Sequence, residues 1–138
     1  MIRLIAILLI GGIPTTIAFA DDPVDAPASP VAPLMRMKLE SAKEILEGLT
    51  TEDFGQIAQN ARSLKLFSLE TGWNVIQTPM YTTQSDDFRR AADMVVEAAN
   101  DRDISRAALG YVAVTVRCVE CHAYIRKHRS QLSNKQLQ

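Results

Sequence analysis

Residues 103–126, DISRAALGYVAVTVRCVECHAYIR, carry both cysteines of the chain within a helical pattern. Asp103 is a favourable N-cap residue for a helix that starts at the next position. From there, apolar, cysteine and histidine residues recur at steps of three and four, which predicts that one face of a single helix is buried. The predicted face comprises Ile104, Ala107, Ala108, Tyr111, Val114, Cys118, His122 and Ile125.

The segment after Pro33 predicts a first helix with one apolar stripe. The stripe consists of Met35, Leu39, Ala42, Ile45, Leu46 and Leu49. Gly48 is expected near the C-terminal end of this helix. The solvent side is expected to hold Lys38, Glu40, Lys43 and Glu47.

A second helix is predicted to follow at once. Thr50 and Asp53 resemble a capping box for its start, Trp73 extends its apolar pattern, and Thr78-Pro79 ends it. Its stripe consists of Phe54, Ile57, Ala58, Ala61 and Leu64.

A third helix is predicted to start with Ser85 as its N-cap. Its stripe consists of Phe88, Ala91, Ala92, Val95, Ala98 and Ala99. Four amphipathic helices joined by short turns predict an all-α chain, folded as an antiparallel four-helix bundle over residues 34–130. Residues 131–138 are expected to form a disordered tail.

The first 20 residues have the features of a secretory signal peptide. Arg3 precedes an apolar run from Leu4 to Ile10, and Ala18-Phe19-Ala20 places small residues where signal peptidase reads. The sequence therefore predicts export to the periplasm, with an uncleaved N-terminal anchor as the alternative. Residues 21–33, DDPVDAPASPVAP, contain four prolines and are expected to be a disordered leader.

The charge balance argues against one class of partner. The chain has 15 Lys and Arg against 16 Asp and Glu, and signal cleavage removes Arg3 from the basic residues. Such a domain lacks the basic excess that neutralises phosphates, so no nucleic-acid partner is expected. No other segment is apolar enough to span a bilayer, so no membrane span is expected after cleavage.

The residues Cys118-Val119-Glu120-Cys121-His122 form the C-x-x-C-H pattern of covalent haem attachment. Two thiols at this spacing can add to the two vinyl groups on one porphyrin edge, and the adjacent imidazole can bind the iron. Cys118 and Cys121 are therefore the predicted attachment sites of one haem c, and His122 is its predicted axial iron ligand.

Two other uses of this motif fit less well. A thioredoxin-type C-x-x-C disulfide follows a strand, and no strand is predicted here. A zinc site needs four ligands, whereas His128 is the only other Cys or His residue in the chain.

With this motif on the last helix of a bundle, the chain resembles the cytochrome c′ family, monohaem c-type cytochromes built on four helices. The family's signature places an arginine four residues after the histidine, and Arg126 occupies that position. Tyr124 and Ile125 reverse the commoner order, in which an aromatic residue directly precedes the arginine. The resemblance covers residues 34–128 in helix count and motif placement, and only the C-terminal motif is specific.

The resemblance implies roles for several residues. His122 would be the proximal ligand, and Arg126 would lie near its exposed side, where its charge could influence the iron potential or bind a propionate. A solvated helix end is the alternative for Arg126. Leu39 and Tyr111 would also lie near the haem.

In that family, the first helix lays one side chain over the other haem face. A methionine there gives six-coordinate iron and an electron carrier, whereas a non-ligand leaves five-coordinate iron that binds small gases. Met35 is the predicted sixth ligand, and Met37 and Met80 are the alternatives, although methionine is also a common core residue. Leu34 or Leu39 over the iron would leave an open face.

The sequence therefore predicts an exported one-electron carrier with His/Met-ligated haem, which exchanges electrons with partner proteins that the sequence does not identify. The alternative is a five-coordinate protein that binds nitric oxide or carbon monoxide. An enzyme is not expected, because a haem peroxidase needs a distal histidine or arginine and the first three helices contain no histidine. A homodimer through the first two helices, using Leu66 and Leu69, is a further expectation from the resemblance.

Overall fold

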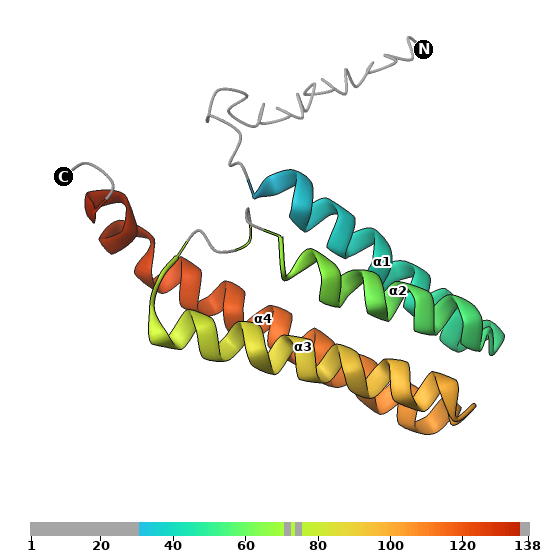
Figure 1. Ribbon diagram of the computed structural model, residues 1–138. Helices are drawn as coiled ribbons and strands as arrows, with labels where there is room; N and C mark the ends of the chain where they lie inside the picture. The colour runs from blue at the N-terminus through green and yellow to red at the C-terminus, as the bar shows by residue number, and fades with distance from the viewer. Residues whose placement is uncertain (1–30, 71–72, 74–75, 136–138) are drawn as a thin grey trace, which may run out of the picture.

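The computed structural model describes residues 31–70, 73 and 76–135, and four helices make up most of this part of the chain. These are α1 (Ala32–Thr51), α2 (Phe54–Phe67), α3 (Pro79–Asn100) and α4 (Ile104–Lys135). Figure 1 shows the α1–α2 pair beside the α3–α4 pair, with successive helices antiparallel. No strand occurs among the described residues, so the predicted all-α four-helix bundle is confirmed.

The four helices are not packed equally closely. Long interfaces join α1 to α2, α2 to α3 and α3 to α4, whereas α1 approaches α4 at far fewer points. The bundle is therefore most open between its first and last helices, and α4 is the helix that carries the two cysteines.

The main core lies between the four helices, and α1 contributes the fully buried Ile45 to it. The predicted stripe of the third helix is confirmed, and so is that of the second except for Phe54, which is partly buried. The buried residues of the two stripes are Ile57, Ala58, Ala61, Leu64, Phe88, Ala91, Ala92, Val95, Ala98 and Ala99. Small side chains in these stripes let the helices approach closely. At Gly110, a Cβ atom would lie 2.9 Å from Val95 Cγ2, so α3 and α4 are in close contact there.

A second apolar cluster lies around the start of α1 and the α2–α3 connection. Its buried members are Leu34, Trp73, Ile76 and Tyr81. Partly buried residues of α4, among them Cys121, Tyr124 and Ile125, pack against it. Trp73 does not extend α2, which ends at Phe67; it lies in the connection instead.

The buried face of α1 differs from the predicted stripe. It consists of Leu34, Lys38, Ser41, Ile45 and Gly48. Leu39 and Leu46, predicted to be buried, are 58% and 50% exposed. The expectation that Lys38 faces solvent is therefore wrong. Both sets of positions repeat at helical spacing, so periodicity alone could not choose between them, and the packing of α1 against its neighbours decides.

The turn between α1 and α2 also differs from the prediction. The C-cap of α1 is Glu52, in a left-handed conformation with φ 56°, rather than Gly48. Gly48 lies inside the helix, where a Cβ atom would be 2.9 Å from Ile57 Cγ1, so its lack of a side chain allows α1 to approach α2. Asp53, and not Thr50, caps α2 by accepting a first-turn backbone N–H at 2.9 Å.

The start of α3 lies further toward the N-terminus than predicted. Thr78 is the N-cap, because its hydroxyl accepts the backbone N–H of Tyr81 at 3.2 Å. Pro79 takes the first helical position, where its missing N–H costs no hydrogen bond. Ser85, the predicted cap, is buried inside the helix. The predicted cap of the last helix is confirmed, since Asp103 Oδ1 accepts a backbone N–H of the first turn at 2.9 Å.

The helical region extends beyond both predicted boundaries. α1 begins at Ala32, with Pro33 in its first turn, and α4 continues to Lys135 rather than ending at residue 130. Residues 131–135 contain no proline or glycine that would end a helix. The predicted signal peptide, residues 21–30 of the leader and residues 136–138 lie outside the described residues.

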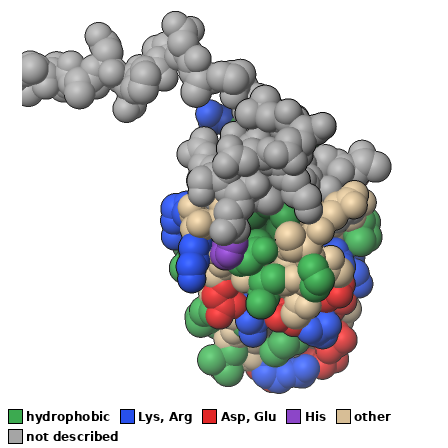
Figure 2. Space-filling view, turned by 90° about the vertical axis from the view of Figure 1, so that its left-hand side faces the viewer, with side chains coloured by type: hydrophobic (Ala, Val, Ile, Leu, Met, Phe, Trp, Pro, Cys, Tyr) green, Lys and Arg blue, Asp and Glu red, His purple; other side chains and the backbone are tan. Residues whose placement is uncertain are grey.

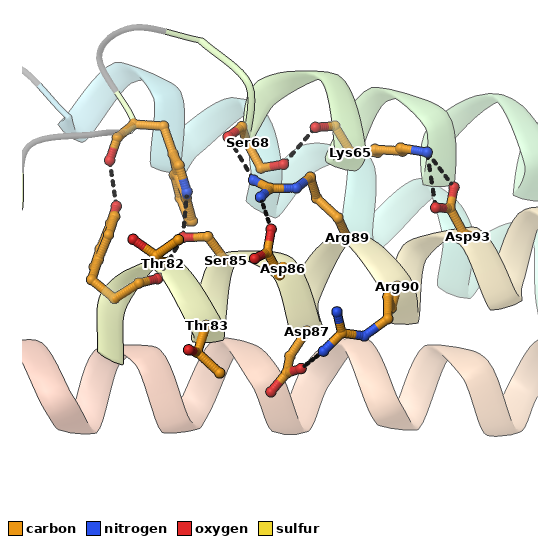
Figure 3. Close-up of polar contacts among 12 residues, drawn as sticks. Lys65, Ser68, Thr82, Thr83, Ser85, Asp86, Asp87, Arg89, Arg90 and Asp93 are labelled. Carbon is orange, nitrogen blue, oxygen red and sulfur yellow. Dashed lines mark hydrogen bonds and ion pairs between the residues drawn. The ribbon is translucent and has the colours of Figure 1, made fainter. Parts of the chain in front are cut away.

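Polar contacts join α2 to α3 on the surface of the bundle (Figure 3). Lys65 Nζ lies 2.8 Å from both carboxylate oxygens of Asp93. Arg89 pairs with Asp86 and also donates to the backbone carbonyl of Ser68 at 3.4 Å. Exposed ion pairs each contribute only about 0–1 kcal/mol. We infer that these contacts align α2 with α3, while the apolar core supplies most of the stability.

Candidate functional site

A cavity of about 680 Å³ lies between α1, α3, α4 and the α2–α3 connection. Its volume falls within the range of about 300–1,000 Å³ that is typical of ligand and cofactor sites. The wall is largely apolar and includes Leu64, Trp73, Ile76, Phe88, Val114 and Ile125. The end view in Figure 2 shows hydrophobic side chains at the surface among charged ones, with a histidine beside them.

All three residues of the predicted haem motif line this cavity. Cys118, Cys121 and His122 form part of its α4 wall, so all three border the same space. Cys118 and His122 have exposed side chains and Cys121 is half-buried. The prediction that Cys118 and His122 lie on a buried helix face is therefore wrong, because both line a cavity in which their side chains keep accessible surface.

The surroundings of the two thiols favour their neutral form. Burial raises the pKa of Cys118 and of Cys121, and the nearby Lys38 acts in the opposite direction on both. For Cys118, this desolvation holds despite its exposed area, because the neighbouring wall displaces much of the water around the sulfur. Both cysteines are free thiols.

Hydrogen bonds fix the α2–α3 connection as one wall of the cavity. Trp73 Nε1 donates to Ser85 Oγ at 2.9 Å, and Ser85 Oγ donates to the backbone carbonyl of Tyr81 at 2.8 Å. The Tyr81 hydroxyl in turn donates to the Trp73 backbone carbonyl. Thr78 Oγ1 and the Tyr124 hydroxyl lie 3.0 Å apart and tie the connection to α4. Burial raises the pKa of Tyr81, so it remains a neutral donor.

One charged side chain is buried in this apolar wall. Lys38, on α1, is only 7% exposed, and its Nζ lies 3.5 Å from the centroid of the Trp73 ring and 3.7 Å from that of the Phe88 ring. Its amine has no hydrogen-bond partner. Burial lowers the pKa of Lys38 to about 7; the cysteine pair opposes this shift and Arg89 adds to it.

Gln84 Oε1, which belongs to another residue of the cavity wall, is likewise buried without a partner. Sequence reasoning missed both residues. A signal existed for Lys38, because it lies four residues after Leu34 and seven before Ile45, on the same helix face. It was overlooked because a lysine on an amphipathic helix is ordinarily assigned to solvent.

The remaining candidates are distributed unevenly around the cavity. Met35 is half-buried and lines it, and Leu39 also lines it despite its exposed area. Met37 and Met80 are 46% and 53% exposed and do not belong to the wall. Leu34 is buried in the second apolar cluster and is not a wall residue.

Of the three residues that the resemblance placed near a haem, Leu39 lines the cavity, whereas Tyr111 and Arg126 lie outside its wall. Tyr111 is partly buried against the main core, and burial, with a smaller effect of Cys118, raises its pKa. Arg126 is exposed one turn beyond His122. Neither lines the cavity, so any contact with a group inside it would be peripheral.

The residues of the cavity fit a flat, apolar, iron-bearing group. Two thiols and one imidazole occupy one wall, the other walls are mainly apolar, and a buried amine without a partner lies opposite. Among the described residues, no group of three or more His, Cys, Asp and Glu side chains could hold a bare metal ion.

A scan against protein-family models finds no match, and searches of curated proteins and of solved structures find no similar protein. The likeness to cytochrome c′ thus depends on the cysteine–histidine motif and on its place in the chain. Within residues 31–70, 73 and 76–135, no helix is long and apolar enough to cross a membrane.

Proposed function

We propose that this protein is an exported c-type cytochrome of the cytochrome c′ kind, which carries one electron at a time on a single covalently bound haem. The observation that supports this most directly is the arrangement of Cys118, Cys121 and His122 along one wall of a largely apolar cavity of about 680 Å³. A C-x-x-C-H motif by itself is short. Its location beside a cavity that could enclose a porphyrin gives it a structural context.

Each motif residue has a distinct role in this proposal. Cys118 and Cys121 would hold the haem through two thioether bonds, and His122 would bind the iron from the α4 side. When bound, the haem supplies the one-electron chemistry; the protein sets its environment. The apolar walls would exclude water and limit the reorganisation that accompanies a change of charge.

The coordination on the opposite face distinguishes an electron carrier from a gas-binding protein. α1 forms that side of the cavity, and Met35, the ligand that the sequence predicts, belongs to the wall. The second candidate function is a five-coordinate haem protein that binds nitric oxide or carbon monoxide. Its support is Leu39, a side chain without ligand atoms that lines the same side.

The proposed function can be tested with the full-length chain expressed beside a cytochrome c maturation system. We expect one covalently bound haem in the wild type, detected by mass and by the reduced-minus-oxidised spectrum. Cys118→Ser combined with Cys121→Ser should abolish covalent attachment. Absence of covalent haem from the wild type would refute the proposal.

The same preparation separates the two candidate functions. A carrier should be low-spin in both oxidation states and should bind carbon monoxide slowly or not at all. A high-spin ferrous protein that binds carbon monoxide at once would instead support the gas-binding alternative.

We also propose that the protein is exported and that it forms a homodimer. Retention of the first 20 residues in protein recovered from a periplasmic fraction would favour the uncleaved anchor over the signal peptide. Leu66 and Leu69 are 59% and 56% exposed, which is compatible with a homodimer through the first two helices. Light scattering of Leu66→Ser combined with Leu69→Ser, compared with the wild type, tests that expectation.

A further inference from the structure

On the basis of the proposed haem, we infer that the ε-amine of Lys38, and not the thioether of Met35, is the sixth ligand of the iron. Both side chains come from α1 and line the cavity opposite the α4 motif. They differ in what surrounds them, and this difference determines which one requires a partner inside the cavity.

Lys38 presents a buried polar atom that nothing in the described part of the chain satisfies. Its side chain is 7% exposed, and its Nζ has no hydrogen-bond partner. An unsatisfied buried polar group costs about 1–3 kcal/mol. Buried amines in proteins are therefore paired, and this one is paired only with aromatic rings.

The rings hold the amine at the cavity wall without occupying its lone pair. Nζ lies between Trp73 and Phe88, at 3.5 Å and 3.7 Å from the two ring centroids. The ring centroids themselves are 6.1 Å apart, so the nitrogen contacts both rings at once. Trp73 is fixed in turn by its hydrogen bond to Ser85, which makes this a rigid support rather than a chance position of a flexible side chain.

Met35 has no comparable unsatisfied group. It is half-buried and packs against the apolar cluster of Leu34, Trp73, Ile76 and Tyr81. A thioether in such surroundings is stable as a core side chain, since it forms no strong hydrogen bonds that burial would remove. The burial of Met35 is therefore accounted for by packing alone, whereas the amine of Lys38 is buried without a hydrogen-bond partner.

Binding to the iron would give the buried amine of Lys38 the partner that it lacks. The amine would bind as the neutral form, with its proton released to solvent and its lone pair forming the nitrogen–iron bond. A nitrogen ligand in place of sulfur would also favour the ferric state and lower the reduction potential, because thioether ligation raises the potential of haem iron.

The test uses the full-length, haem-loaded protein in its oxidised form, with electronic and electron-paramagnetic-resonance spectra as the readout. We expect the wild type to be low-spin and to lack the near-infrared sulfur-to-iron charge-transfer band. Lys38→Leu should lose this low-spin signal, either becoming high-spin or acquiring the sulfur-to-iron band as Met35 replaces the amine. Met35→Leu should keep the wild-type spectrum.

The matched control is Lys43→Leu, which removes an exposed lysine of the same helix that is paired with Glu40. It should leave every spectrum unchanged. A sulfur-to-iron band in the wild type that Met35→Leu removes would overturn the inference. So would a Lys38→Leu protein whose spectra are the same as those of the wild type, or a wild type that is high-spin.

A measurement on the wild type keeps the inference testable if Lys38→Leu does not fold. When lysine nitrogen is isotopically labelled, the low-spin signal should show hyperfine coupling to the label. Absence of that coupling would overturn Lys38 ligation while leaving covalent haem, and hence the proposed function, intact. Absence of covalent haem from every variant and from the wild type would instead refute the proposed function itself.

Discussion

Gly110→Ala tests the close approach of α3 to α4, the helix that carries the C-x-x-C-H motif. A Cβ atom at Gly110 would lie 2.9 Å from Val95 Cγ2, 3.3 Å from Val95 N and 3.4 Å from Val95 Cα. Val95 is fully buried, and two of these three atoms belong to its backbone. The contact can therefore be relieved only by moving one helix away from the other.

The expected effect combines two opposing contributions. Overpacking of a tight core costs about 1–3 kcal/mol. Alanine is favoured over glycine within a helix by about 1 kcal/mol. We therefore expect Gly110→Ala to lower the free energy of unfolding by about 1 kcal/mol, although the substitution would stabilise an isolated helix.

Gly55→Ala is the matched control on α2. There the nearest atom to an added Cβ is Asp53 Oδ1 at 3.3 Å, a side-chain oxygen that also accepts the backbone N–H of Gln56, and the backbone has no positive φ. We expect a gain of about 0.4–1 kcal/mol, as for other glycines whose conformation suits alanine.

The measurement is urea unfolding followed by circular dichroism, with the wild type and both variants compared in the same haem state. Gly110→Ala should unfold at lower urea and Gly55→Ala at equal or higher urea than the wild type, with unchanged m-values. A Gly110→Ala protein as stable as the wild type would refute the close packing of α3 and α4. Equal losses in both variants would show that the effect does not arise at this contact.

Three further predictions concern the cavity and the last helix. In haem-free protein, Lys38→Leu should raise the free energy of unfolding most at pH 7 and below, because the Lys38 amine is then charged in both the folded and the unfolded protein. This stabilisation should shrink as pH rises from about 7 toward 10.5, because over that range the amine stays protonated only in the unfolded protein. Unfolding measured at a series of pH values tests this, and a stabilisation by Lys38→Leu that grows with pH would contradict the expected direction. Ser85→Ala should destabilise the folded protein by about 1–3 kcal/mol, because it leaves the Trp73 indole N–H without an acceptor. Ser85→Thr should destabilise it less, and thermal unfolding of both variants measures the difference. Asp103→Ala should lower the free energy of unfolding by about 1 kcal/mol, because Asp103 caps α4 by accepting a backbone N–H, and Asp103→Ser should lower it little. Unfolding in urea measures this, and an alanine variant as stable as the wild type would refute the cap.

Much of the fold could be predicted because local rules and tertiary packing agree in α2 and α3. Their stripes of alanine and larger apolar residues have one buried face at helical spacing, and the structure buries it. The helix ends were harder to predict. Thr78-Pro79 can end one helix or start the next. The structure shows that it starts α3, because the Thr78 hydroxyl accepts the backbone N–H of Tyr81.

The residues of the candidate site were also predictable only in part. Cys118, Cys121 and His122 could be found from the sequence because covalent attachment chemistry requires contiguous residues. The residues on the opposite side of the cavity could not be found from the sequence. It is assembled from α1, α3 and the connection between α2 and α3, and no sequence pattern records which residues of these segments meet.

The sequence by itself determined four helices and the chemistry of one wall, because helical periodicity and the C-x-x-C-H spacing are both local properties of the chain. Only the tertiary structure decided which face of α1 turns inward. Met35 and Lys38 both belong to helical series along α1, and the packing of that helix buries Lys38 more deeply. The burial of an amine depends on the aromatic rings that surround it, and Trp73 and Phe88 reach it from distant parts of the chain.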